Sequence, residues 1–344
     1  MPKINSLNTL KLFAVFGVLA CHTGLCPGFD ACARMVEILF LISGFLMAYN
    51  YFNTTTDYTL LCGSKIILKK LPRFYPIHVI TFLLQLFFVA TWYNKSLNYK
   101  FSIGTLNLSL QHAWFKSTEF SFNNVSWFLS SLIFCYFITP SLIGFIKNTK
   151  NLLIPFLSIF TIRLFIEHIT ITEPRYIGID LHCNPFVQSL NYSLGYILGV
   201  YFIQKTTFNT FLKQKTSASY ISLLQILITI FYLLSCYYLN SFYRIFFVVL
   251  TLPLIYVFAI DRGAFAKLSN IKPIKFLENI TLEIFMFHSF ILYHFPTDIK
   301  NPITYIKFLS LTLIVSIAYH VIYKNIKKIL INVTLNTNNQ LNER

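Results

Sequence analysis

The sequence has little charge for its length. Only 12% of its 344 residues are Asp, Glu, Lys or Arg, whereas 56% are hydrophobic and 18% are aromatic. Soluble domains carry about a quarter charged residues, so this chain has roughly half of the usual charge. Apolar runs of about 18 to 22 residues recur along the chain, and each is long enough to cross a hydrocarbon core about 30 Å thick. The composition therefore predicts an all-α, multi-pass membrane protein.

Metal-binding cysteine patterns are also missing. The seven cysteines are an odd number, and no two of them form a CxxC pair. A structural zinc site needs closely spaced ligand pairs, which this sequence does not offer. Most of the cysteines lie in or beside apolar runs, where a free thiol behaves as a small hydrophobic group. We expect buried thiols and no metal; the cysteines are Cys21, Cys26, Cys32, Cys62, Cys135, Cys183 and Cys236.

A signal-peptide cleavage site is absent from the expected place. The N-terminal stretch MPKINSLNTLKLF has a basic start before an apolar run, as a signal peptide does. The residues that follow the run, ACHTGLCPG, do not form a small-x-small cleavage motif. We therefore expect residues 7–24 to be a retained first span.

Ten apolar runs are predicted to span the membrane. They are residues 7–24, 35–52, 76–93, 126–146, 152–170, 186–203, 218–239, 242–260, 279–295 and 304–323. Residues 98–118 contain too many polar residues for a span, and we expect a non-spanning loop there with room for an interfacial helix. No stretch between spans is long enough to bury a core of its own. Residues 1–331 thus form one membrane domain, and the polar residues 332–344 are expected to be a disordered tail.

Acidic residues are scarce, and the basic residues are unevenly placed. The chain has 28 Lys and Arg against 12 Asp and Glu, a net charge of +16. If the N-terminus is cytoplasmic, the loops on the cytoplasmic side hold most of the Lys and Arg. The positive-inside rule then places both termini in the cytoplasm. Because the positive charge follows the topology, we expect no nucleic-acid partner.

The first span contains two ionisable residues, Lys11 and His22, within LKLFAVFGVLACHTG. Eleven positions correspond to about three helical turns, so both side chains project from nearly the same face, about 16 Å apart along the axis. Ionisable groups inside a span are costly and indicate function. The alternative is that Lys11 extends to the cytoplasmic headgroups and that His22 ends the helix at the outer interface.

The second span and the loop after it add polar and basic groups. Glu37 lies near the outer end of EILFLISGFLMAYNYF, and Ser43 and Gly44 lie in its interior, where small residues permit close helix packing. The following segment KIILKKLPRFYPIH concentrates four cations within nine residues, from Lys65 to Arg73. This cluster is either a topology signal or a phosphate-binding patch.

Several polar residues are candidates for the outer side, where a second substrate would bind. The loop EPRYIGIDLHCNP could line an entrance for an acceptor, and intramembrane polar groups indicate function by default. Arg163 also has a structural alternative, because Glu167 is its i, i+4 partner. The candidates are Trp127, Arg163, Arg175, His182 and His288.

Six motifs in register resemble the integral-membrane acyltransferase-3 family, whose members O-acylate cell-surface carbohydrates in bacteria. The family has a basic residue, ten residues and then His, matched by Lys11 to His22, with Lys in place of the commoner Arg. An acidic residue followed by SGF is matched by Glu37 to Phe45. KKLPRFYP, WFLS, SLNYSLGYILG and TLEIFMFH match four later motifs. In order, they cover about residues 5–295.

The resemblance implies transfer of an acyl group, expected to be acetyl, from cytoplasmic acetyl-CoA to a hydroxyl of a surface glycan or its lipid-linked precursor, in the bacterial inner membrane. By this resemblance His22 is the general base and Lys11 its basic partner. A Lys offers a point charge where Arg offers a bidentate fork. The expected acyl-donor tunnel comprises Glu37, Ser43, Gly44 and Phe45, and the expected site for CoA phosphates comprises Lys69, Lys70 and Arg73.

Two other classes of membrane protein remain open from the sequence. A polysaccharide flippase or polymerase also has many spans and few charges, and it would use polar residues such as Arg163, Arg175 and His182. A receptor-like or structural protein would have no chemistry, and the pairing of Lys11 with His22 would then be incidental.

Overall fold

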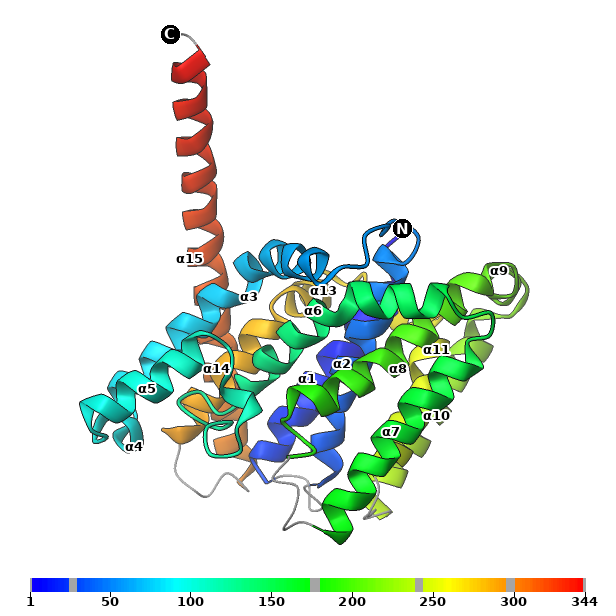
Figure 1. The fold of residues 1–344 in the computed structure, drawn as a ribbon, viewed down its shortest axis with the longest axis horizontal. Coiled ribbons are helices and arrows are strands. Elements are labelled where there is room, and N and C mark those ends of the chain that lie inside the picture. The colour runs from blue at the N-terminus through cyan, green and yellow to red at the C-terminus, as the bar shows by residue number, and fades with distance from the viewer. Residues whose placement is uncertain (1, 25–29, 174–179, 239–243, 295–300, 343–344) are drawn as a thin grey trace.

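The computed structural model describes residues 2–24, 30–173, 180–238, 244–294 and 301–342, and every regular element in these ranges is a helix (Figure 1). The helices are α1 (Asn5–His22), α2 (Asp30–Tyr51), α3 (Leu60–Phe88), α4 (Ala90–Tyr93), α5 (Leu97–Leu108), η1 (His112–Trp114), α6 (Trp127–Lys147), α7 (Leu153–Thr172), α8 (Pro185–Gln204), α9 (Thr206–Lys215), α10 (Ala218–Tyr238), α11 (Ile245–Ala259), α12 (Ala264–Leu268), α13 (Lys272–Asn279), α14 (Thr281–Tyr293) and α15 (Pro302–Asn342). The predicted all-α class is confirmed for the described residues.

In the described residues, nine of the ten predicted spans each overlap mainly one helix, and the span 76–93 covers the second half of α3 together with α4. Five helices in the described part of the chain are long and apolar enough to cross a membrane: α3, α6, α7, α10 and α15. The helices α11 and α14 are apolar but shorter, with 15 and 13 residues. The protein is thus a multi-pass membrane protein, whereas the number of ten spans stays a prediction. Both ends of the chain lie at the same end of the bundle (Figure 1).

Glycines hold α2 and α8 together at the centre of the bundle. A Cβ atom added at Gly44 would lie 1.9 Å from the backbone oxygen of Tyr192. One added at Gly195 would lie 2.1 Å from the backbone oxygen of Leu41. Only hydrogen atoms fit at these two positions, so the small residues let the two backbones touch. The SGF motif therefore contributes to helix packing through its glycine.

A polar layer fastens the segment between α3 and α6. The ring of His78 bonds the backbone oxygen of Asn107 at 3.0 Å, and the ring of His112 bonds the Ser126 hydroxyl at 3.0 Å. All four residues are buried. α5 has 12 residues and is about 18 Å long, too short to cross about 30 Å of hydrocarbon. The prediction of a helix-containing segment that does not span the membrane is consistent with this geometry.

Three expectations are wrong in their details. α3 begins at Leu60, well before the predicted residue 76, and includes the basic cluster as well as Pro72 and Pro76. α15 continues to Asn342, so the polar tail is helical up to that residue, where disorder was expected. Cys21 is disulfide-bonded and is not a free thiol; the described free cysteines are Cys62, Cys135, Cys183 and Cys236.

Substitution of Gly44 by Ala tests the glycine contact between α2 and α8. The added methyl group would overlap the α8 backbone, so we expect a loss of about 1–3 kcal/mol in the free energy of unfolding. Gly104→Ala is the matched control, because a Cβ there would lie 3.4 Å from the Phe82 ring, an ordinary contact. Thermal unfolding in detergent measures both variants, and equal stability of the two would contradict the packing role.

Candidate functional site

A basic cavity of about 300 Å³ opens at one end of α1. Four cations line it: Lys3 and Lys11 near the start of the chain, and Lys70 and Arg73 on α3. A single carboxylate, that of Glu278, also lines it, and it accepts hydrogen bonds from the hydroxyls of Thr9 (2.8 Å) and Ser269 (2.5 Å). The cavity therefore carries net positive charge and attracts anions. We call it the basic cavity.

Apolar groups from four helices form one wall of this cavity. They are Val15 of α1, Leu39 of α2, Phe128, Leu129 and Leu132 of α6, and Leu282 and Phe285 of α14. Cations beside an apolar wall suit a ligand that joins phosphates to a less polar arm. Leu7 and Val15 lie about one helical turn before and after Lys11, and both are buried in the bundle. The aliphatic part of the Lys11 side chain therefore passes through apolar surroundings.

The structure separates the residues expected in the donor tunnel and at the CoA phosphates. Ser43 lines the basic cavity, together with Lys70 and Arg73. Gly44 packs against α8 instead, and Phe45 is fully buried against Phe202 at a ring distance of 5.4 Å. Glu37 pairs with Arg34 at 3.3 Å. Lys69 is exposed and is not among the described lining residues.

The other end of α1 borders a second cavity, of about 420 Å³. His22 lines it with residues of α3, α4, α14 and the segment before α6. The set is His22, Gln85, Val89, Thr91, Trp92, Phe120, Phe122, Asn124, Ser289, Leu292 and Tyr293. We call this the outer cavity. Lys11 and His22 thus reach different cavities from one helix, as their spacing predicted for opposite depths.

A hydrogen bond joins His22 to His288, which lies 266 positions later in the sequence. The Nδ1 atom of His22 and the Nε2 atom of His288 are 3.0 Å apart. The Nδ1 atom of His288 lies 2.6 Å from the backbone oxygen of Phe285. A carbonyl oxygen only accepts hydrogen bonds, so His288 Nδ1 carries the proton. In the neutral pair, His288 Nε2 then accepts from His22 Nδ1, and the lone pair of His22 is on Nε2.

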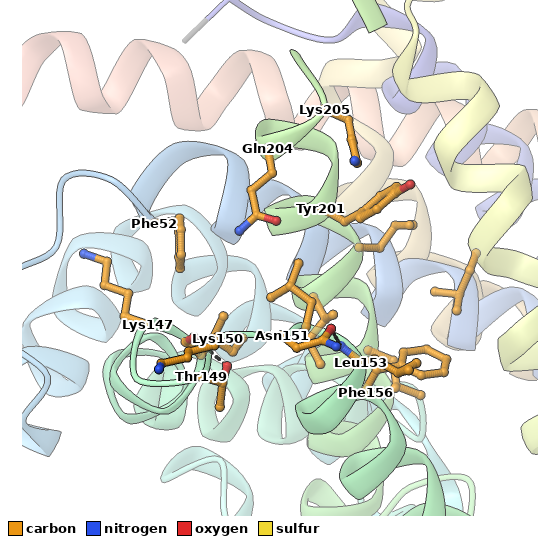
Figure 2. A pocket seen from close by; sticks show the side chains of 16 residues that line it. Phe52, Lys147, Thr149, Lys150, Asn151, Leu153, Phe156, Tyr201, Gln204 and Lys205 are labelled. Carbon is orange, nitrogen blue, oxygen red and sulfur yellow. Dashed lines mark hydrogen bonds between the residues drawn. The ribbon is translucent and has the colours of Figure 1, made fainter. Parts of the chain in front are cut away.

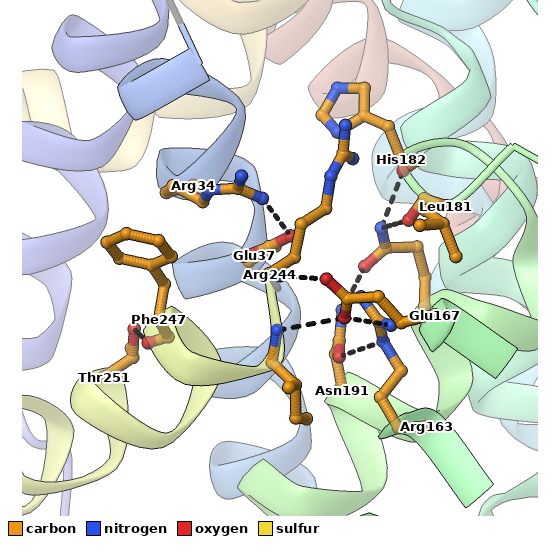
Figure 3. A network of polar contacts seen from close by, with 12 residues as sticks. Arg34, Glu37, Arg163, Glu167, Leu181, His182, Asn191, Arg244, Phe247 and Thr251 are labelled. Carbon is orange, nitrogen blue, oxygen red and sulfur yellow. Dashed lines mark hydrogen bonds and ion pairs between the residues drawn. The ribbon is translucent and has the colours of Figure 1, made fainter. Parts of the chain in front are cut away.

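Buried charges connect α7, α8 and the start of α11, next to the Arg34–Glu37 ion pair of α2 (Figure 3). Arg163 bonds Glu167 at 2.7 Å and Asn191 at 3.3 Å. Glu167 also accepts from the backbone amides of Arg244 and Ile245 at the start of α11. Arg163 and Glu167 are fully buried. The i, i+4 alternative for Arg163 is thus correct, and its contacts are structural.

Trp127 and His182 are not among the described residues that line the outer cavity. Trp127 is 4% exposed and meets the His182 ring edge-on at 4.5 Å. His182 faces Arg244 in Figure 3, and burial together with that cation lowers the pKa of His182 to about 3. Arg175 lies outside the described residues. Of the four candidates that the structure describes, His288 bonds His22, although it is not among the described residues that line the outer cavity.

Glu119, Asp180 and Cys183 have their ligand-type atoms within 4.8 Å of one another. Burial and the neighbouring Asp180 raise the pKa of Glu119 to about 7. The neighbouring carboxyl group thus favours the protonated form of Glu119. The expectation of no metal stays a prediction.

The largest cavity, of about 590 Å³, lies between the loop after α6 and α8 (Figure 2). Lys147, Lys150 and Lys205 surround it. None of the residues singled out from the sequence lines it, so it is not part of the candidate site.

The fold and the two cavities thus define a helical membrane protein with a basic cavity and a histidine pair linked by one helix. Among protein families, residues 4–321 match the acyltransferase-3 family, described as an acyltransferase domain. The chain belongs to this family and is a membrane acyltransferase. No curated protein and no solved structure matches it.

Gln85 and Asn124 are two outer-cavity residues that the sequence did not single out. Gln85 is 3% exposed and belongs to a predicted span, where a lone amide is a signal of function. Asn124 precedes a span in a segment rich in polar residues and therefore carries no such signal. Both were brought to the cavity by the fold.

The pKa of Glu119 yields a pH test. The folded-state pKa of about 7 exceeds the usual value of 4.5, so the folded state holds this proton more tightly than the unfolded state. The resulting stability is complete below about pH 4.5 and is lost as the pH rises through about 7. We expect the melting temperature of the wild type to fall from pH 5 to pH 7.5 relative to that of Glu119→Gln. Parallel curves for the two proteins would contradict the assignment.

Proposed function

We propose that the protein transfers an acetyl group from cytoplasmic acetyl-CoA to a hydroxyl of a cell-surface glycan or of its lipid-linked precursor, with His22 as general base. The single observation that supports this most is the placement of Lys11 in the basic cavity and of His22 in the outer cavity, on one helix. A donor held at one end of α1 then meets an acceptor at the other. The family supports the acyl transfer itself.

In this proposal the basic cavity receives acyl-CoA. Lys11, Lys70 and Arg73 bind the phosphates, because charge-assisted contacts to phosphate are the strongest polar contacts that a side chain makes. The acyl arm then extends along the apolar wall toward Phe285. That residue lines the basic cavity, and its carbonyl oxygen bonds the histidine pair, so the arm would end beside the base.

The chemical step needs a base because a sugar hydroxyl is a weak nucleophile at neutral pH. The Nε2 atom of His22 takes the hydroxyl proton as the oxygen attacks the thioester carbon. The carbon–sulfur bond then breaks, an ester carbon–oxygen bond remains, and the proton passes from His22 to the CoA thiolate. Such proton transfer typically contributes 10²–10⁴ in rate.

His288 acts through His22 in this proposal and has no contact with the substrates. By accepting from Nδ1 of His22, it keeps the lone pair on Nε2 and orients the ring, as second partners of histidines commonly do. The Phe285 carbonyl sets the proton position on His288.

The disulfide of Cys21 supports the proposed orientation. Disulfides persist in oxidising compartments outside the cytoplasm, and Cys21 adjoins His22. The outer cavity would then face away from the cytoplasm, and both termini would face it, in the inner membrane of a bacterium. A flippase or polymerase is less well supported, because the intramembrane Arg163 that it would use is fully buried in an ion pair.

Substitution of His22 by Ala tests the base. We expect transfer from radiolabelled acetyl-CoA to a glycan acceptor to fall by about 10²–10⁴-fold, while acetyl-CoA still binds, since the basic cavity is intact. Unchanged transfer would show that His22 is not the base.

The variant His288→Gln separates the base from its partner. The amide oxygen of Gln can still accept from His22 Nδ1, so we expect a smaller loss than in His288→Ala. Equal loss in both variants would assign His288 a packing role only.

Substitution of Lys11 tests the donor site. A contact to a charged group is worth about 1.5–3 kcal/mol, so Lys11→Ala should raise the KM for acetyl-CoA by roughly 10- to 100-fold. Lys11→Arg keeps the charge and should retain most of the activity. Lys150→Gln, at the largest cavity, is the control for a lost cation and should not change the KM. If the wild type and the three variants have the same KM, Lys11 does not bind the donor, and its side chain only extends to the lipid headgroups.

A further inference from the structure

The described walls of the outer cavity carry no formal charge. Among the eleven described residues that line it there is no Asp, Glu, Lys or Arg. The titratable groups are the rings of His22 and Tyr293. This differs from the basic cavity, which four cations line. A ligand with a permanent charge would lose its hydration on entering the outer cavity. It would gain no oppositely charged partner among the described wall residues.

One amide in this cavity has no partner among the described residues. Gln85 is 3% exposed, and its side chain makes no hydrogen bond to any described residue. The small exposed part of this side chain faces the cavity, where a ligand can reach its amide. Because Gln85 lines the cavity, a ligand in the cavity is the partner that would satisfy both its oxygen and its NH₂ group.

A second amide stands on another wall. The Oδ1 atom of Asn124 accepts a hydrogen bond from the Ser289 hydroxyl. This bond fixes the orientation of the amide and directs its NH₂ group away from Ser289. Ser289 belongs to α14, one position after His288. The amide therefore has a fixed place relative to the histidine pair.

Aromatic rings make up much of the remaining wall. The rings of Trp92 and Phe122 stack with centroids 4.8 Å apart, and the Phe82 ring meets Phe122 from 4.5 Å. Phe122 has a φ angle of 55°, which is a genuine outlier for a bulky residue. Strained backbone of this kind persists where the surroundings hold it, often at ligand sites.

We propose that the outer cavity is an acceptor subsite for an uncharged, hydroxyl-bearing ring, in which Gln85 recognises two neighbouring hydroxyls and the absence of wall charge rejects anionic sugars. This rests on the proposed function, because it is the same His22 that activates the acceptor. The aromatic faces suit the C–H edges of a ring, since their negative quadrupole attracts weakly positive hydrogen atoms. The amides give such a ring the donor and acceptor pairs that fix its orientation.

The size of the cavity agrees with one ring and its immediate substituent. Its volume of about 420 Å³ lies at the lower end of the range of about 300–1,000 Å³ for small-molecule sites. A carboxylate on the ring would need a cation, and burying one without a partner is strongly unfavourable. Discrimination between a neutral sugar and its uronic acid is thus expected from the walls alone.

Binding can be measured without any acetyl transfer. The protein in lipid nanodiscs is titrated with methyl glycosides of glucose, galactose and N-acetylglucosamine, and with those of glucuronic and galacturonic acid. The readout is fluorescence from Trp92, one of three tryptophans, identified as the signal lost in Trp92→Phe. We expect at least one neutral glycoside to change this signal and both uronic acid glycosides to bind at least tenfold more weakly.

Three variants show whether Gln85 is responsible. Gln85→Leu keeps the size and removes both hydrogen-bonding groups, so we expect at least a tenfold weaker response to the neutral glycoside. Gln85→Arg adds a cation and should narrow or reverse the preference against uronic acids. Gln204→Leu makes the same change at the opposite end of the bundle and should leave the response unchanged.

The outcomes distinguish this proposal from the proposed function. Neutral binding that depends on Gln85 supports the subsite even if acetyl transfer is absent, in which case the catalytic proposal fails alone. Uronic acid binding equal to or tighter than neutral binding overturns the subsite. No response to any neutral glycoside, with acetyl-CoA binding intact as proof of folding, overturns it as well.

Discussion

A polar group inside a membrane bundle has no water to bond, so it must find its partner within the protein or face a cavity. This constraint organises the whole molecule. Arg163 and Glu167 meet it largely by pairing with each other, with Asn191 and with the start of α11, although the Nη2 atom of Arg163 has no partner among the described residues. Lys11 and Gln85 meet it differently, because each lines a cavity. The satisfied groups are therefore structural, and those that open into cavities mark the candidate site.

The helix α1 joins the two cavities. Its length and period place a cation at the basic cavity and an imidazole at the outer cavity, while its other face packs into the core. The bond from His22 to His288 ties this first helix to α14 and sets which nitrogen carries the lone pair. The glycine contact of α2 with α8 lies beside this assembly and holds the bundle closed. In the proposed function, the opposite ends of this one helix separate a charged donor from an uncharged acceptor.

Much of the organisation was predictable because it depends on local sequence. Apolar runs indicated each of the helices that form the bundle, and the eleven-residue interval indicated that Lys11 and His22 share a face at different depths. Predictions failed for motif residues whose side chains contact other groups than the motif suggested. Glu37 was expected in the donor tunnel, yet Arg34 takes it as an ion-pair partner. Gly44 and Phe45 share the SGF motif with Ser43, but α2 rotates them by about 100° per residue, so only Ser43 lines the basic cavity.

The sequence by itself determined the all-α membrane class, the family and the two ionisable residues of the first span, because composition and helical period require no knowledge of distant contacts. Only the tertiary structure decided that His288 bonds His22, that the Phe285 carbonyl sets the tautomer, and that Gln85 and Asn124 meet at one cavity. These residues are separated by tens to hundreds of positions, and no local pattern links them. Their proximity depends on how the packed helices cross, which is a property of the bundle and not of any one helix.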